Sequence, residues 1–81
     1  MSRLVFEKVG DINFVYPYLC VYMCGERGPF MEIGVTDFKE LQFTIYASGQ
    51  PVVLHSEEWD EIQRRAAEFL PRVLADEDAS S

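Results

Sequence analysis

Residues 56–73 of the chain, SEEWDEIQRRAAEFLPRV, decide the fold. In this stretch apolar side chains recur at alternating intervals of three and four residues, at Trp59, Ile62, Ala66, Phe69 and Val73. This spacing places them along one stripe of an α-helix, with Trp59 at its head. We therefore expect an amphipathic helix that buries this stripe, Trp59 included, against the rest of the protein.

Both ends of this helix carry sequence signals. Ser56 is a favourable N-cap residue, and a group that we name the acidic helix start follows it: Glu57, Glu58, Asp60 and Glu61. Negative charge there stabilises the positive end of the helix dipole. Pro71 has no N–H to donate to residue 67, so the helix is expected to stop or kink near Leu70. Residues 76–81 are predicted to form a flexible acidic tail, which leaves residues 1–75 as a single domain.

Upstream of the helix, runs rich in Val, Ile, Phe and Tyr alternate with turns that contain Gly, Pro and Asp. The runs that fit short strands are residues 4–9, 13–24, 30–36, 41–47 and 51–55. The predicted fold is α+β: an antiparallel β-meander of four to five strands followed by one C-terminal amphipathic helix packed on one sheet face.

The strand predicted at residues 13–24 has no polar face, unlike the two strands that follow it. One helix covers only one face of a sheet, so the aromatic side chains on the other face need a second environment. We name them the tyrosine-rich face: Phe14, Tyr16, Tyr18, Tyr22 and Tyr46. Three roles stay open for it, namely a second small core under a curled sheet, a self-association surface, or a platform for a ligand or partner.

The charge balance restricts the class of partner. With 14 acidic residues against 7 basic ones, the 81-residue chain carries a net charge of −7. Such a surface disfavours nucleic acid and anionic membranes, and it favours a protein partner with a basic patch. A hydrophobic fraction of 48% excludes a disordered chain.

The start of the chain and its cysteines bear on localisation. Charged residues interrupt any apolar segment of a signal peptide, and the longest nearly uncharged run, residues 12–25, is too short to span a bilayer. A small secreted domain is usually rich in disulfides, whereas this chain has only Cys20 and Cys24. We expect reduced thiols, no membrane association and a cytoplasmic protein.

No group of side chains in the sequence is typical of a catalytic or cofactor site. His55 is the only histidine, and together with Cys20 and Cys24 it supplies too few ligands for structural zinc. The acidic helix start offers carboxylates for hydrolysis or a hard metal, but the helix dipole already accounts for it. We expect no catalytic residue, no metal and no cofactor, and we interpret the protein as a non-enzyme.

Residues 41–62 resemble part of a known family. The run Val53-Leu54-His55-Ser56-Glu57-Glu58-Trp59, followed by Ile62, is similar to the strand-to-helix junction of positive-cofactor-type transcriptional coactivators. The resemblance implies a four-stranded sheet with one helix, a dimer through the helices, and single-stranded DNA on the concave sheet face. That family grips the nucleic-acid backbone with Lys and Arg on its strands, whereas few basic residues precede the helix here: Arg3, Lys8, Arg27 and Lys39. The resemblance therefore carries over topology rather than activity.

Together these patterns predict a small acidic protein-interaction module, an inhibitor, immunity-type or regulatory protein that acts on a basic partner surface. The candidate interaction surfaces are the tyrosine-rich face and the acidic helix start. We expect a homodimer with the tyrosine-rich face as its interface. The alternative is a coactivator-like module that binds single-stranded nucleic acid.

Overall fold

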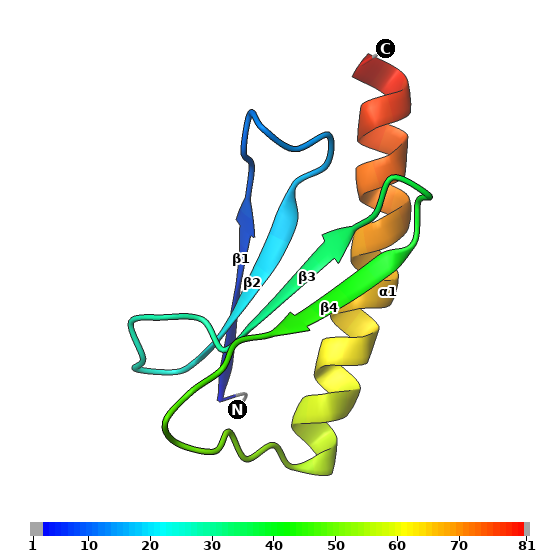
Figure 1. Ribbon diagram of the computed structural model, residues 1–81. Helices are drawn as coiled ribbons and strands as arrows, with labels where there is room; N and C mark the ends of the chain where they lie inside the picture. The colour runs from blue at the N-terminus through cyan, green and yellow to red at the C-terminus, as the bar shows by residue number, and fades with distance from the viewer. Residues whose placement is uncertain (1–2, 81) are drawn as a thin grey trace.

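The computed structural model describes residues 3–80 of the chain, with side chains described through Asp76. Four strands precede one helix: β1 (Leu4–Val9), β2 (Tyr18–Met23), β3 (Met31–Val35), β4 (Leu41–Ile45) and α1 (Ser56–Ser80). The strands form one antiparallel sheet in the order β1-β2-β3-β4, and α1 lies against one side of it (Figure 1). This confirms the predicted α+β meander with one C-terminal helix. Within residues 3–80, no helix has the length and apolarity needed to span a membrane.

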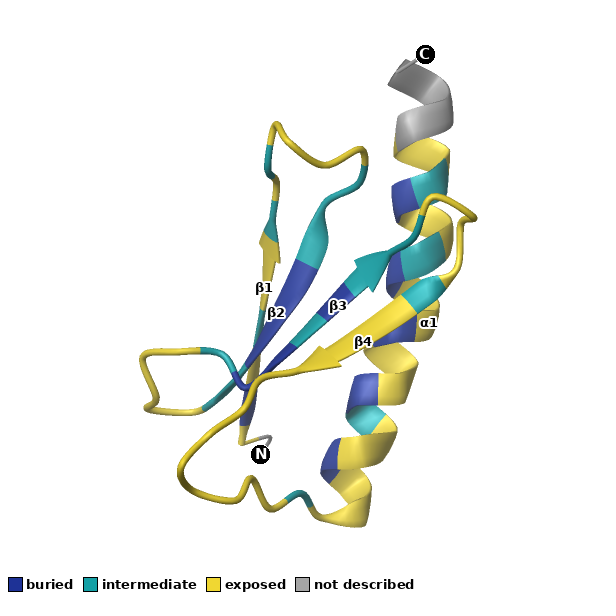
Figure 2. Ribbon diagram, in the orientation of Figure 1, coloured by how far each residue is buried: buried dark blue, intermediate teal, exposed yellow. Residues whose placement is uncertain are grey.

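The core lies between the sheet and α1. Antiparallel register sets Leu19 opposite Ile33 and Val21 opposite Met31, so these side chains share the face that α1 covers. They meet the apolar stripe of the helix, in which Ile62, Ala66 and Val73 are fully buried. Figure 2 shows the buried residues concentrated on β2, β3 and one side of α1. The alternation of the strands and the helical spacing therefore produce a single core, as the sequence indicates.

The helix covers the sheet unevenly. Phe43 and Ile45 of β4 lie opposite Ile33 and Met31 and therefore point to the helix side. They are nevertheless 38% and 66% exposed, because the helix leaves that side of β4 open. At the other edge, the Arg65 guanidinium lies 4.8 Å from the ring centre of Phe6 and covers β1. An apolar strip along the helix side of β4 thus stays in contact with solvent.

The first turn of α1 does not follow the predicted apolar stripe. Trp59 is 46% exposed, and the buried position in the first turn belongs to Glu58. Both Glu58 oxygens accept hydrogen bonds from the Arg3 guanidinium, at 2.5 and 2.6 Å, and Oε1 also accepts from the His55 N–H at 2.7 Å. The His55 carbonyl receives the first helical bond, from Trp59, so the cap residue is His55 rather than Ser56. An ion pair with the N-terminal segment therefore fixes the first turn, where we expected an apolar contact.

Two of the predicted strands differ most from the structure, while those at 30–36 and 41–47 are shorter by two residues each. The strand predicted at residues 13–24 begins only at Tyr18, because Asp11 ties the preceding segment into a turn and Pro17 lacks an N–H. No strand forms at residues 51–55, which belong to the connection that leads from β4 to the helix. The sheet accordingly has four strands.

The helix also runs further than predicted. It passes Pro71 and continues to Ser80, so Leu70 is not its end. Pro71 is exposed, and water can satisfy the Ala67 carbonyl that the proline cannot reach. Residues 76–80, predicted as part of a flexible tail, continue this helix, while Ser81 lies outside the described residues. Their flexibility stays a prediction.

Candidate interaction surface

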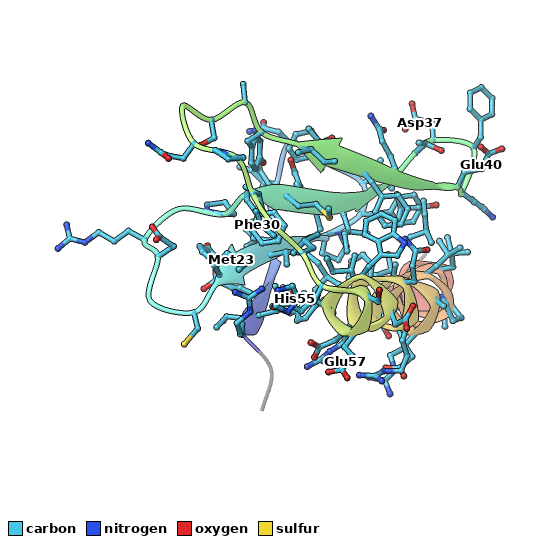
Figure 3. All side chains as sticks on the ribbon, turned by 90° about the horizontal axis from the view of Figure 1, so that it is seen from below. Met23, Phe30, Asp37, Glu40, His55 and Glu57 are labelled. Atoms are coloured by element: carbon cyan, nitrogen blue, oxygen red, sulfur yellow. The ribbon has the colours of Figure 1, made fainter. Side chains whose placement is uncertain are left out.

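The sheet face turned away from α1 is the main candidate site, and we name it the open face. Because side chains alternate along each strand, the residues opposite to the core positions share this face. They form rows across the strands, such as Glu7, Cys20, Glu32 and Thr44 in paired register. Figure 3 looks nearly along the helix and shows it on one side of the sheet, with no element of the described chain covering the other. The open face is thus available to a partner.

Tyrosine hydroxyls on the open face bind neighbouring carboxylates. The Tyr46 hydroxyl donates a hydrogen bond of 2.7 Å to Glu32 Oε2, and the Tyr22 hydroxyl donates one of 3.2 Å to Glu7 Oε1. The bond to Glu32, together with desolvation, raises the pKa of Tyr46 to about 12. These pairs hold the rings and carboxylates in place, so the face is organised before any partner arrives.

The open face is electronegative. Desolvation is the main cause of the raised pKa values of Tyr18 and Cys20, and the nearby negative charges of Glu32 and Glu7 raise both pKa values further. Lys8 is the only basic residue in the four strands, and its ammonium lies 3.9 Å from Asp76 of the helix. No strand therefore supplies a positive charge to this face. Its chemistry suits cations and opposes phosphate.

A hollow of about 630 Å³ lies at one end of the open face. Its floor includes Glu32, Gly34, Gln42 and Thr44 of β3 and β4. Its walls come from the β1–β2 connection, residues 14–17, and from the β3–β4 turn, residues 36–38. Figure 1 shows these two connections at the same end of the sheet. Side chains separated in sequence thereby meet around one depression.

The structure gathers most of the predicted tyrosine-rich face. Tyr18 and Tyr22 of β2 share the open face with Tyr46, which follows β4. Phe14 lies in the β1–β2 connection, with its ring edge-on to Tyr18 at 6.1 Å between centroids. Tyr16 lies in the same connection and packs partly against the core cluster while also lining the hollow. A second core, one of the three roles left open for these rings, does not form in the described chain, since the rings are half-buried or exposed.

The acidic helix start does not act as one surface. Glu58 is 7% exposed and engaged by Arg3, which lowers the pKa of its carboxyl to about 2 and raises that of Arg3. Glu57 and Asp60 are exposed, and Glu61 is half-buried. Figure 3 places Glu57 beside His55 at the first turn of the helix, which packs on the opposite face of the sheet from the open face. The two predicted acidic and aromatic regions therefore lie apart.

The remaining candidates for chemistry are separated. Cys20 is buried on the open face, Cys24 is exposed in the following turn, and the two form no disulfide with each other. His55 Nδ1 lies 4.0 Å from Glu58 Oε1. Across the part of the chain that the structure describes, no three His, Cys, Asp or Glu side chains gather closely enough to hold a metal ion.

Glu7, Glu32 and Gly34 belong to the site although the sequence did not single them out as candidates. The alternation in residues 30–35 already sets Glu32 and Gly34 opposite Met31 and Ile33. What that pattern lacks is register, which is needed to bring Glu32 beside Cys20 and Glu7.

Comparison of the chain with protein-family models, curated proteins and solved structures found no match.

Proposed function

We propose that this protein is a small acidic, non-enzymatic interaction module that binds a basic surface of a partner protein through the open face. Its role would be that of an inhibitor, an immunity-type protein or another regulator that covers the partner. The proposal includes no catalysis, no metal and no cofactor, and it places the protein in the cytoplasm.

The observation that carries the proposal is the composition of the open face. Glu7 and Glu32 are held by tyrosine hydroxyls, and no strand contributes a basic side chain beside them. Half-buried tyrosines provide apolar area with a hydroxyl that stays hydrated, as interface tyrosines do. Because the sheet holds these groups rigidly, binding costs little ordering of the face. A basic partner would gain both steering by charge and contact area.

The alternative function, binding of single-stranded nucleic acid, draws support from the order of four strands and one helix, which agrees with the coactivator resemblance. The charge of the open face counts against it. Aromatic rings stack on bases, but affinity for the backbone comes from Lys and Arg. We therefore expect no oligonucleotide affinity tighter than about 10⁻⁴ M at physiological salt.

Homodimer formation also stays a proposal. A two-fold contact through the open face would bring Glu7 and Glu32 close to the same carboxylates of the second copy. Contact through the exposed apolar strip of β4, with Phe43 and Ile45, avoids this repulsion between carboxylates. We therefore place the second copy against β4 rather than against the tyrosine-rich face.

Light scattering at high micromolar concentration tests this placement. We expect a mass of twice 9.3 kDa. Ile45→Glu should give a folded monomer, and Tyr22→Glu should stay dimeric. Dissociation by Tyr22→Glu alone would put the dimer on the open face and remove that face from the proposed function. A wild-type monomer would exclude the homodimer.

Affinity capture from the native host tests the proposed function itself. The bait variants are Glu7→Gln/Glu32→Gln on the open face and, as a control of equal charge change, Glu57→Gln/Asp60→Asn on the helix. The captured protein is identified by mass spectrometry, purified and titrated by calorimetry at two salt concentrations. We expect a basic partner whose affinity falls about tenfold or more for the open-face variant and little for the control. An acidic partner, no partner, or the reverse ranking of the variants would contradict the proposal.

A further inference from the structure

The hollow at the end of the open face has a preformed shape. A methyl group built on Gly34 would meet no atom within 4 Å, so open space lies directly above this part of β3. On one side, Asp11 fixes the β1–β2 connection. Its side chain accepts a hydrogen bond from the Asn13 N–H, and its backbone carbonyl accepts one from the Phe14 N–H. On the other side, Thr36 Oγ1 accepts from the N–H groups of Phe38 and Glu40. Both walls are therefore fixed by local hydrogen bonds.

Aromatic rings line these walls. Phe14, Tyr16 and Tyr18 come from the β1–β2 side, and Phe38 comes from the β3–β4 turn. Phe38 is 85% exposed, so most of its ring surface is free to contact a bound group. Lys39 follows in the left-handed conformation, with φ of 65°, and is not part of the lining. The turn therefore presents a phenyl ring to the hollow and not an ammonium group.

The charged group at the floor is Glu32. Its Oε2 accepts from Tyr46, and no donor among the described residues meets its Oε1. Asp37 adds a second carboxylate to the lining, while no Lys, Arg or His contributes to it. A cation in the hollow would therefore meet the carboxylates of Glu32 and Asp37, several aromatic rings and no positively charged neighbour.

We propose that this hollow receives an arginine side chain of the basic partner, an inference that rests on the proposed function. A guanidinium is planar and weakly hydrated, so it stacks on aromatic rings while its N–H groups reach a carboxylate. A lysine ammonium is a compact, strongly hydrated charge and uses flat ring surfaces less well. Glu32 thus supplies the charge and the rings supply the preference for arginine.

The test is a titration of ¹⁵N-labelled protein, followed by NMR, with N-acetyl-arginine N-methylamide. The matched probes are the citrulline derivative, which has nearly the same shape without the charge, and the lysine derivative. We expect the arginine probe to shift the amide signals of Gly34 and Phe38 with a dissociation constant of about 1–10 mM. The lysine probe should bind about threefold more weakly or worse, and the citrulline probe should cause no saturable shift.

Two variants locate the interaction. Glu32→Gln should weaken arginine binding about tenfold, whereas Glu68→Gln, an equal charge change on the exposed surface of the helix, should leave it unchanged. Phe38→Ala should also weaken it, and since this side chain is exposed the variant is expected to fold. The spectrum of each free variant reports whether its fold is intact.

Several outcomes would overturn the inference. These are equal shifts with citrulline, equal affinity for lysine, no effect of either site variant, or no saturable shift with the arginine probe. Such a failure would remove the arginine site alone, because the capture experiment measures partner binding through Glu7 and Glu32 together. Failure of the capture experiment with a positive titration would instead leave a cation site without the proposed partner.

Discussion

The two faces of the sheet are built from the same four strands, yet they use their side chains in opposite ways. On the covered face, the apolar side chains of Val21, Met31 and Ile33 are fully buried in the core under the helix. On the open face, Tyr22 and Tyr46 keep their rings half-buried or exposed and direct their hydroxyls to Glu7 and Glu32. Apolar burial is therefore concentrated on one face of the sheet, whereas the other face carries carboxylates bound to tyrosine hydroxyls.

The same substitution on each face should show the largest difference. Val21 is fully buried on β2, whereas Val5 lies on the open face of β1 and is nearly half exposed. Val21→Ala should lower the free energy of unfolding by about 2–3 kcal/mol, and Val5→Ala by about 0.5 kcal/mol. Urea denaturation followed by circular dichroism measures both. Similar losses for the two variants would mean that the open face is also a core.

Acidic pH should lower the stability of the fold by protonating the Glu58 carboxylate. The folded-state pKa of this carboxyl, about 2, lies below its ordinary value of 4.5, so folding favours the ionised form. Its contribution to stability is complete above pH 4.5 and is lost as the pH falls toward 2. Glu58→Gln should lower Tm by several degrees at pH 7, and the difference from wild type should shrink below pH 4.5.

The control for this pH dependence is Glu57→Gln, a neighbouring exposed carboxylate on the same helical turn. It should leave both the Tm at pH 7 and the acid limb of the stability curve close to those of the wild type. A constant Tm difference between Glu58→Gln and wild type from pH 7 to pH 2 would show that the Arg3 ion pair does not carry the effect.

The smallest expected effect is a difference in the thiol reaction rates of the two cysteines. Burial raises the pKa of Cys20, and the charges of Glu32 and Glu7 raise it further, while Cys24 is exposed. Cys20 should therefore react with a thiol reagent at least about tenfold more slowly than Cys24 in the native protein. Cys20→Ser and Cys24→Ser variants assign the two rates. Equal rates would mean that the tyrosines and carboxylates do not shield the thiol.

The sequence predicts the elements better than it predicts their contacts. The first strand begins and ends where expected, and the helix stripe from Ile62 to Val73 is correct, because period and length are local properties. Glu58 and Trp59 are consecutive residues and therefore point in directions about 100° apart around the helix. Which of them is buried depends on Arg3, which is 55 positions away in the chain and binds Glu58. No local pattern contains that choice.

The candidate site shows the same limit. Tyrosines at alternate positions reveal a second aromatic face, since one helix covers only one side of a sheet. The pairing of Tyr46 with Glu32 and of Tyr22 with Glu7 depends on register between strands, which composition does not provide. Aromatic character was therefore predictable from the sequence, whereas the negative charge among the rings required the fold.

The measurement that tests the central claim most directly is a pair of anisotropy titrations of the protein into two labelled probes. One probe is a short peptide of alternating arginine and serine, and the other is an oligothymidylate. We predict that the peptide binds, that its affinity falls with added salt, and that Glu7→Gln/Glu32→Gln weakens it while Glu57→Gln/Asp60→Asn does not. The oligonucleotide should bind no more tightly than about 10⁻⁴ M. Micromolar oligonucleotide binding that weakens as salt rises, with no binding of the peptide, would contradict the account.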